Sequence, residues 1–383
     1  MPEKTRVCID GRLSAAAETG VASYGHAVRE ALDAIGSPPA ILMDGAGGRF
    51  GVASGRLAAM ARAARAALPA PVRLRVGADA AILFAPDIYR LAQVRFRQSG
   101  DLLRLRVDGP AGIMHWTYPI PARIDGWANV YTVHDVIPLT APHLSPMEPK
   151  ALRRRILRIA ESADRIVAVS DWARRSIIAE LGLPASHVTD CGSGLAGMAA
   201  GQGALPGGLV RGGYFLYCGL FEPRKNLDRL VAGWQASGSV LPLVVTGPER
   251  AEDAVLRAAL VSRGVTLLPY QPRSAFVDLL RGARALLFPT LEEGFGLPIV
   301  EAMALGVPVL TTDRGAMADT AGGAALLVEA ESVDSIARGV RQLQDDDDLH
   351  VMLAARGTVR ARAFSPTAFG ARLTALYTDL ARS

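Results

Sequence analysis

Short apolar strands alternate with helical segments along this chain, and the alternation starts again near its middle. In the first half we expect strands at residues 7–10, 80–84, 112–116, 129–135 and 165–170, and helices at 24–35, 149–163 and 171–181. In the second half we expect strands at residues 214–219, 243–247, 265–270, 284–290, 308–312 and 324–329, and helices at 227–235, 252–262, 273–282, 298–305 and 333–343. Parallel neighbours need crossover helices, so this order predicts an α/β fold built on parallel sheets.

A Gly- and Ala-rich segment, residues 192–213, separates the two series and carries almost no charge. Such a segment is typical of an interdomain linker. We therefore place one domain at residues 1–197 and a second at 207–364, and we expect a C-terminal helix, about residues 365–383, to pack back on the first. A chain of 383 residues suits two cores better than one. The cleft between two such domains is the natural ligand site.

Composition narrows the class of protein. Half of the residues are apolar, but no continuous apolar run approaches the roughly 18 residues that cross a bilayer. The opening MPEKTRVCIDGR has no apolar signal-peptide core, and the three cysteines form no CxxC pair. We expect a cytoplasmic protein with buried thiols and without a zinc site.

Basic residues are concentrated in the first half of the chain. Residues 1–200 carry 24 Lys and Arg against 18 Asp and Glu, whereas the whole chain has a net charge of +5. Three interpretations stay open: solvated helix faces, attraction to anionic lipid headgroups, and nucleic acid. The last is the weakest, because interleaved aromatics and a nucleic-acid-binding motif are missing, so we expect no nucleic-acid partner. The second would bring peripheral contact with the inner face of the cytoplasmic membrane.

The segment RALLFPTLEEGFGLPIVEAMALGVPVL, residues 284–310, is the most informative stretch. It predicts a buried strand, a glycine-bearing loop at the strand's carboxyl end, and a helix that begins at Pro298. The amides of Phe295, Gly296 and Leu297 would then point from a helix N-terminus into the cleft. Such an end attracts anions, and a diphosphate is the obvious candidate.

Two acids frame this turn, Glu293 before the helix and Glu301 in what we expect to be its first turn. In one interpretation Glu301 only complements the helix dipole and Glu293 is a solvated loop acid. In the other, both carboxylates face the ligand and accept hydrogen bonds from sugar or ribose hydroxyls. The residues alone do not choose between these.

The pattern Glu293-x7-Glu301 within EGFGLP, followed by EAMALGVPVL, resembles the donor-site signature of the family 4 retaining glycosyltransferases. The resemblance covers most of the chain and is strongest over residues 214–329. It implies two Rossmann-like domains facing across a cleft, the GT-B arrangement, with the acceptor on the first and the nucleotide sugar on the second. It also implies that Glu301 binds the donor ribose and that Glu293 approaches the transferred sugar, near Gly294 and the Phe295 and Gly296 amides.

A second patch, YCGLFEPRKNLDRLV, places Arg224 and Lys225 after a strand of the second domain. Cations there can neutralise the charge on a leaving diphosphate, and EPRKN resembles the family's phosphate-binding motif. Gly219 and Gly247, each at the end of a strand, complete the donor site. Leu220 is a departure, because many members carry an additional Arg directly after the glycine. We infer that the residues that bind the phosphates differ here from those of many members.

The first domain has its own candidates. His134, in TVHDVIPL, matches the histidine of the family's central motif near the transferred sugar, and we count it as catalytic with Glu293, Arg224 and Lys225. The resemblance of ETGVASYG to the family's first loop implies that Gly20 lets the acceptor or the diphosphate approach the backbone. His115 is a weaker candidate. The loop after residue 190 departs from the family's Pro-Asn-Gly pattern, so its contacts are not carried over.

The family implies transfer with retention of anomeric configuration from a nucleotide diphosphate sugar. The acceptor would be a saccharide or a polyprenyl-diphosphate-linked saccharide. The closest resemblance is to bacterial mannosyltransferases of O-antigen or exopolysaccharide synthesis, which makes GDP-mannose the first candidate donor. The four-carboxylate run at residues 345–348 is adequately explained as a solvated helix end, and no other DxD motif is present, so we expect no cofactor and no metal. The alternatives are a sugar-nucleotide 2-epimerase, a glycan phosphorylase, and a non-catalytic scaffold of a polysaccharide-assembly complex. A NAD dehydrogenase is disfavoured, because the first strand is not followed by GxGxxG.

Overall fold

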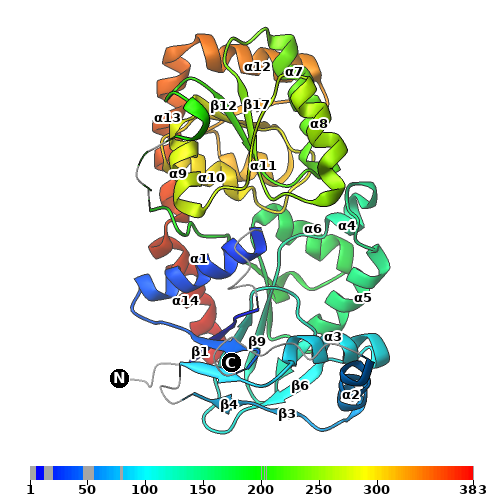
Figure 1. The fold of residues 1–383 in the computed structure, drawn as a ribbon. Coiled ribbons are helices and arrows are strands. Elements are labelled where there is room, and N and C mark those ends of the chain that lie inside the picture. Colours follow the sequence, from blue (N-terminus) through cyan, green and yellow to red (C-terminus); the bar gives the residue numbers. More distant parts are fainter. Residues whose placement is uncertain are drawn as a thin grey trace.

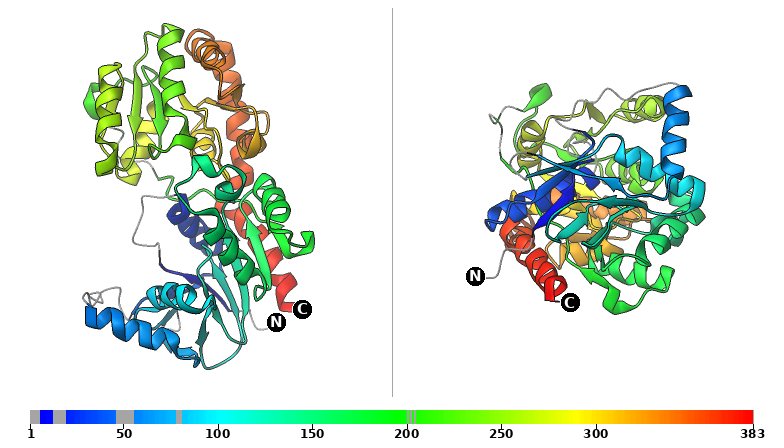
Figure 2. Two further views of the ribbon diagram at one scale, coloured as in Figure 1. Left: turned by 90° about the vertical axis from the view of Figure 1, so that its right-hand side faces the viewer. Right: turned by 90° about the horizontal axis from the view of Figure 1, so that it is seen from below.

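The computed structural model describes residues 6–12, 20–45, 56–77, 81–199, 201, 203 and 205–382. It has two α/β domains stacked end to end, each around its own sheet (Figure 1). Two further views show the same separation of the two domains (Figure 2). The predicted fold class, two parallel-sheet domains facing across a cleft, is confirmed.

The sheet of the first domain has eight strands in the order β11-β10-β9-β7-β1-β2-β5-β4. They are β1 (Val7–Asp10), β2 (Ala40–Met43), β4 (Arg75–Val76), β5 (Ile82–Phe84), β7 (Ile113–Trp116), β9 (Ala128–Val133), β10 (Arg165–Ala168) and β11 (Val188–Asp190). All neighbours are parallel except the edge pair β4 and β5. The carboxyl ends of β1, β7 and β9 therefore lie together at one edge of the sheet, which faces the cleft.

Helices pack on both faces of this sheet. They are α1 (Gly20–Ala34), α2 (Arg56–Ala67), α3 (Ile88–Ser99), α4 (Ile137–Thr140), α5 (Pro149–Ala160) and α6 (Asp171–Leu181). A small three-stranded sheet of β3 (Val72–Arg73), β6 (Leu103–Arg106) and β8 (Ala122–Ile124) lies at the end of the domain away from the cleft. We had not expected this sheet.

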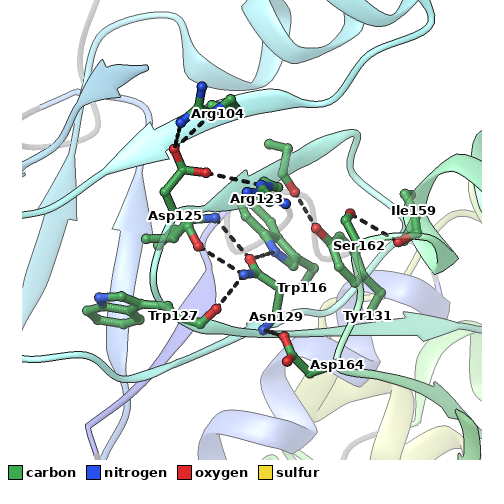
Figure 3. A network of polar contacts seen from close by, with 12 residues as sticks. Arg104, Trp116, Arg123, Asp125, Trp127, Asn129, Tyr131, Ile159, Ser162 and Asp164 are labelled. Carbon is green, nitrogen blue, oxygen red and sulfur yellow. Dashed lines mark hydrogen bonds and ion pairs between the residues drawn. The ribbon is translucent and has the colours of Figure 1, made fainter. Parts of the chain in front are cut away.

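A polar network fixes the start of β9 (Figure 3). The Asn129 amide donates to the carbonyls of Ile124 and Trp127, and its oxygen accepts from the Ile124 N–H and the Trp116 indole. Asp125 in the same turn accepts from Arg104 and Arg123. Buried polar groups that satisfy one another in this way favour one register. The network thus sets the position of the strand whose far end carries His134.

The second domain has six parallel strands in the order β14-β13-β12-β15-β16-β17. They are β12 (Phe215–Cys218), β13 (Leu243–Thr246), β14 (Thr266–Leu268), β15 (Ala285–Phe288), β16 (Val309–Thr312) and β17 (Leu326–Val328). Its helices are α7 (Leu227–Ser237), α8 (Ala254–Ser262), α9 (Arg273–Gly282), α10 (Leu297–Ala304), α11 (Gly315–Ala321), α12 (Val333–Asp345) and α13 (Asp347–Ala361). The strands are continuous apolar runs, as expected for a sheet covered on both faces.

The chain crosses between the domains twice. The first crossing joins β11 to β12, and the second joins α13 to the last helix, α14 (Pro366–Arg382). Helix α14 packs against α1, and its residues Phe369, Leu373 and Tyr377 belong to the core of the first domain (Figure 1). The two crossings touch, because the Leu195 N–H donates to the Phe364 carbonyl at 2.9 Å. Within the described residues, no helix is both long enough and apolar enough to span a bilayer.

Candidate active site

A cavity of about 440 Å³ lies between the domains, at the carboxyl ends of both sheets. This volume is within the usual range for a small-molecule site. Every residue that we assigned to the site from the sequence lines it: Gly20, His134, Gly219, Arg224, Lys225, Gly247, Glu293, Gly294, Phe295, Gly296, Leu297 and Glu301. The structure therefore brings together residues that are up to 281 positions apart, between Gly20 and Glu301. Their chemical roles remain predictions.

The expected strand, loop and helix are present around Glu293, with one correction. Helix α10 begins at Leu297, so Pro298 is its second residue, and Glu301 is the fifth residue and lies beyond the first turn. The helix-dipole interpretation of Glu301 is therefore weakened, because that effect falls off within the first turn. Glu301 is 5 % exposed and borders the cavity, so its carboxylate is placed for a ligand.

The loop before α10 is held against the first domain. The Ser170 hydroxyl donates to the Gly294 carbonyl at 2.6 Å and also caps α6 through the Ala173 N–H. A Cβ on Gly294 would lie 2.2 Å from the His134 carbonyl oxygen, so no side chain fits there. Gly296 has a positive φ of 87°, which lets the chain turn into α10. The loop thus presents its amides at a fixed place between the domains.

Replacing Gly294 with Ala should force this loop away from the first domain. The contacting atom is backbone, so relief requires the two domains to move apart. We expect a loss of about 1–3 kcal/mol of stability, typical of overpacking, and weaker donor binding. Thermal unfolding and nucleotide titration would measure both. Gly25→Ala is the control, because its Cβ would meet nothing closer than 3.7 Å; equal effects of the two substitutions would refute this account.

Two cations and one carboxylate meet at the centre of the cavity. Glu293 pairs with Lys225 and with Arg224, the latter at 2.8 Å, and Arg224 also pairs with Glu222 at 2.8 Å. Burial alone would raise the pKa of Glu293, but Lys225 and Arg224 outweigh burial and hold the pKa below its usual value. Burial likewise opposes the charge on Arg224, yet Glu293 and Glu222 raise its pKa. Glu293 and Arg224 are therefore both charged near neutral pH.

Glu301 has a partner that the sequence did not indicate. Arg273, the first residue of α9, approaches its carboxylate to 2.7 Å. The same guanidinium donates to the carbonyls of Ala196 and Gly197 in the first crossing between the domains. Burial raises the pKa of Glu301 although Arg273 opposes this. Nothing in the sequence marks Arg273, because its partners are brought together only by the tertiary fold.

His134 is held in one tautomer. Its Nε2 lies 2.9 Å from the Thr117 carbonyl, which can only accept, so Nε2 carries the hydrogen and Nδ1 is left as an acceptor. Burial lowers the pKa of His134 to about 4, and the ring is neutral near pH 7. The side chain can therefore accept a hydrogen bond from a ligand hydroxyl. It is not suited to act as a general acid there.

Thr117 is itself held by a buried acid at the end of β1. Asp10 accepts from the Thr117 N–H at 2.5 Å and from its hydroxyl at 2.9 Å. The second oxygen, Oδ1, is buried without a partner among the described residues. Burial raises the pKa of Asp10 to about 6, although the Thr117 hydrogen bonds lower it in part. Asp10 thus positions the carbonyl that orients His134.

Asp10→Asn should change how stability depends on pH. The folded-state pKa of Asp10 lies above its unfolded value of 3.8, so the buried charge destabilises the fold above about pH 6 and ceases to do so as the pH falls. An Asn can keep both Thr117 hydrogen bonds. Relative to wild type, the variant should therefore gain on the order of 2–3 kcal/mol between about pH 4 and pH 7.5. Urea unfolding at both pH values measures this, with the exposed Asp33→Asn as control; a pH-independent difference would contradict the assignment.

The structure also bears on two weaker expectations, those for Gly20 and His115. Gly20 is the first residue of α1, and a Cβ there would meet nothing within 4 Å, so the space beside it is open to a ligand. His115 does not line the cavity. It is fully buried between the Tyr377 hydroxyl at 2.6 Å and the Thr132 hydroxyl at 2.8 Å, and it joins α14 to the sheet. Its role is structural.

Solved structures with the same architecture are glycosyltransferases of the GT-B class. Sucrose-phosphate synthase from Thermosynechococcus elongatus superposes with a TM-score of 0.70 at 18% identity, over 99% of this chain and 100% of that one. Anabaena HepE in complex with UDP and glucose superposes with a TM-score of 0.66 at 12% identity, over 98% of this chain and 100% of that one. At such identities the likeness shows the fold alone.

Sequence relatives are more specific. Residues 20–192 match Glycosyltransferase Family 4, and residues 211–360 match glycosyl transferases group 1. O-antigen chain mannosyltransferase B from Escherichia coli is 32% identical over 264 residues, which cover 64% of this chain and 68% of that protein. A D-inositol 3-phosphate glycosyltransferase from Nocardia farcinica is 27% identical over 311 residues, covering 73% of this chain and 64% of that protein. The chain belongs to glycosyltransferase family 4, and it is a glycosyltransferase.

Proposed function

We propose that this enzyme transfers a mannosyl group from a nucleotide diphosphate mannose, with GDP-mannose as the first candidate, to a saccharide acceptor in bacterial polysaccharide synthesis. The observation that carries the proposal is the 32% identity to an O-antigen chain mannosyltransferase. Relatives named as serotype-specific mannosyltransferases, 24% identical over 276 residues, support the same sugar. The acceptor would be carried on a polyprenyl diphosphate lipid, with the enzyme at the inner face of the cytoplasmic membrane.

The cavity supports a division of labour for this reaction. The donor diphosphate would lie between Arg224, Lys225 and the amides that precede α10, and the carboxylate of Glu301 would accept from the ribose hydroxyls. Glu293 would then direct its carboxylate to the hydroxyls of the sugar while it stays bonded to Lys225. His134, with Nδ1 as acceptor, would take a hydrogen bond from a sugar hydroxyl.

The anomeric configuration would be retained by attack of the acceptor hydroxyl on the face that the diphosphate leaves. The bond from the anomeric carbon to the phosphate oxygen breaks, the bond to the acceptor oxygen forms, and the acceptor proton passes to the departing phosphate. Negative charge grows on that phosphate in the transition state, and preorganised cations there lower the barrier. Arg224 and Lys225 supply the positive charge that stabilises this phosphate. We therefore propose transfer without a metal ion or other cofactor.

The proposal is tested by binding first and chemistry second. Thermal shift against UDP, GDP, dTDP and their common sugars should select guanine nucleotides. The selected donor should then be hydrolysed slowly by the enzyme alone and transferred to a mannose-containing acceptor. An epimerised donor without transfer would indicate the 2-epimerase alternative instead. If no nucleotide binds, the protein is a scaffold and the proposal fails.

A further inference from the structure

Four arginines of the first domain lie close enough together to act on one another electrostatically. Arg12 follows β1, Arg97 lies in α3, and Arg154 and Arg155 are consecutive in α5. Among the described residues, none of the four forms an ion pair with a carboxylate. We refer to these four residues as the arginine cluster.

The cluster is built around one aromatic ring. The guanidinium carbons of Arg154 and Arg155 lie 5.3 Å and 5.9 Å from the centre of the Phe96 ring, so α3 and α5 are side by side here (Figure 1). Cation–π contacts of this kind hold guanidinium planes in place. Arg97 follows Phe96 directly in the chain and is exposed. The guanidinium groups of Arg154 and Arg155 are thus positioned before any ligand arrives.

Arg155 is the half-buried member of the cluster, and its surroundings do not compensate its positive charge. Its Nε is buried and has no hydrogen-bond partner among the described residues. Burial lowers the pKa of Arg155; Tyr118 opposes this, and the nearby charges of Arg12, Arg97 and Arg154 lower it further. A half-buried guanidinium beside three like charges is unfavourable unless an anion completes the site.

Two other arginines on the same helices do have carboxylate partners. Arg95 of α3 and Arg158 of α5 share Asp101, at 3.7 Å and 3.0 Å, and Arg158 also pairs with Glu161. These two helices therefore do meet carboxylates, but among the described residues none of these pairs with the arginine cluster. Asp10 interacts electrostatically with Arg12 but, in the described part of the chain, forms no ion pair with it, and the Asp10 Oδ2 accepts a hydrogen bond from the Thr117 N–H.

The cluster is connected to the active site. Tyr118, which acts electrostatically on Arg155, follows β7, and its ring centre lies 6.5 Å from that of His134. His134 lines the cavity. A ligand that reaches from the cavity along Tyr118 would therefore place its next group at the arginine cluster. Arg224 and Lys225, in the second domain, would instead bind the donor diphosphate.

We infer that the arginine cluster is a subsite for a phosphate or diphosphate group carried by the acceptor. Guanidinium groups match phosphate oxygens by paired hydrogen bonds, so a cluster of them suits this chemistry better than a neutral saccharide. A flat bilayer surface suits it less, because Arg155 is half-buried and leads inward to Tyr118. The inference rests on the proposed function in that the ligand is taken to be the acceptor.

The test is a calorimetric titration of inorganic pyrophosphate into the whole protein, with its donor site saturated by the nucleoside diphosphate that binds best. Arg97→Gln and Arg155→Gln should each weaken pyrophosphate binding by about tenfold, the effect of one charge-assisted hydrogen bond. Arg106→Gln is the matched control, since it removes one exposed positive charge from β6, outside the cluster. Arg97 is exposed, so its variant is expected to fold and carries the test if Arg155→Gln does not.

Two results would overturn the inference. The first is wild-type pyrophosphate affinity in the Arg97 variant, or an equal loss in Arg106→Gln, which would indicate net charge alone. The second comes from vesicles: if Arg97→Gln loses binding to phosphatidylglycerol vesicles but keeps its pyrophosphate affinity, the cluster recognises a membrane surface. Inorganic phosphate in place of pyrophosphate separates a soluble sugar phosphate from a lipid-linked diphosphate as the source. If no nucleoside diphosphate binds, the proposed function fails by that result, and the titration is read on the free protein.

Discussion

Glu293→Ala is expected to lower turnover by about 10²-fold with little rise in the KM for the donor, whereas Glu301→Ala should chiefly raise that KM. Glu293 is held beside Lys225 and Arg224 at the centre of the cavity, where its carboxylate would align the sugar with the leaving diphosphate. Loss of alignment affects the transition state more than binding. Glu301 contributes hydrogen bonds to the ribose, which does not react. Its removal should weaken donor binding by about 10- to 100-fold.

Steady-state kinetics with varied donor, together with direct titration of the nucleoside diphosphate, separate the two effects. Glu252→Ala is a suitable control, because its side chain is 74% exposed. Wild-type turnover in the Glu293 variant would remove the basis for placing the transferred sugar next to it. A Glu301 variant with unchanged donor affinity would leave its contact with Arg273 as its whole role.

Lys225→Met should reduce turnover by about 10²–10³-fold, the usual effect of removing one preorganised group from a site of developing charge. Lys225 is 11% exposed and bonded to Glu293, and its Nζ lies 5.0 Å from the centre of the Phe288 ring, so the ammonium is fixed in position. The loss should appear in kcat and in kcat/KM, because the demand on the cation is greatest as the diphosphate leaves.

Arg224 remains beside Glu293 in this variant, so the buried carboxylate keeps one partner and the protein should fold. Lys150→Met, at the exposed start of α5, controls for the loss of one positive charge. Thermal unfolding checks the fold and single-turnover kinetics measure the chemical step. An unchanged chemical step in Lys225→Met would mean that the charge on the diphosphate is stabilised elsewhere.

The strands and helices that carry the site could be predicted because their patterns are strong. Strand β1 and helices α6 and α9 have the predicted bounds, and the strands of the second domain differ from the prediction by one to two residues at most ends. Strands β3 and β4, of two residues each, are too short to show any alternation. Helix α11 was missed because its sequence, GAMADTA, has too few large apolar residues to show a helical period.

The site residues could be predicted by a motif, but their partners could not. Glu301 was recognisable from its spacing to Glu293, whereas its pairing with Arg273 depends on how α9 lies against α10 and on the path of the crossing chain. Likewise, His134 was recognisable, but the hydrogen bond that fixes its tautomer is donated by its ring to the backbone carbonyl of Thr117, just after the neighbouring strand β7. A carbonyl has no sequence signature.

The contact between Leu195 and Phe364 has a mechanical consequence. A pair of domains joined by one tether can rotate in any direction, but here two covalent segments pass side by side between the lobes. We therefore expect the relative motion of the two domains to be a hinge bending about these two adjacent connecting segments. The cleft should therefore open and close about one hinge, with little lateral displacement of one domain against the other. The donor bound on the second domain and the acceptor bound on the first would then meet in the same relative position at every turnover.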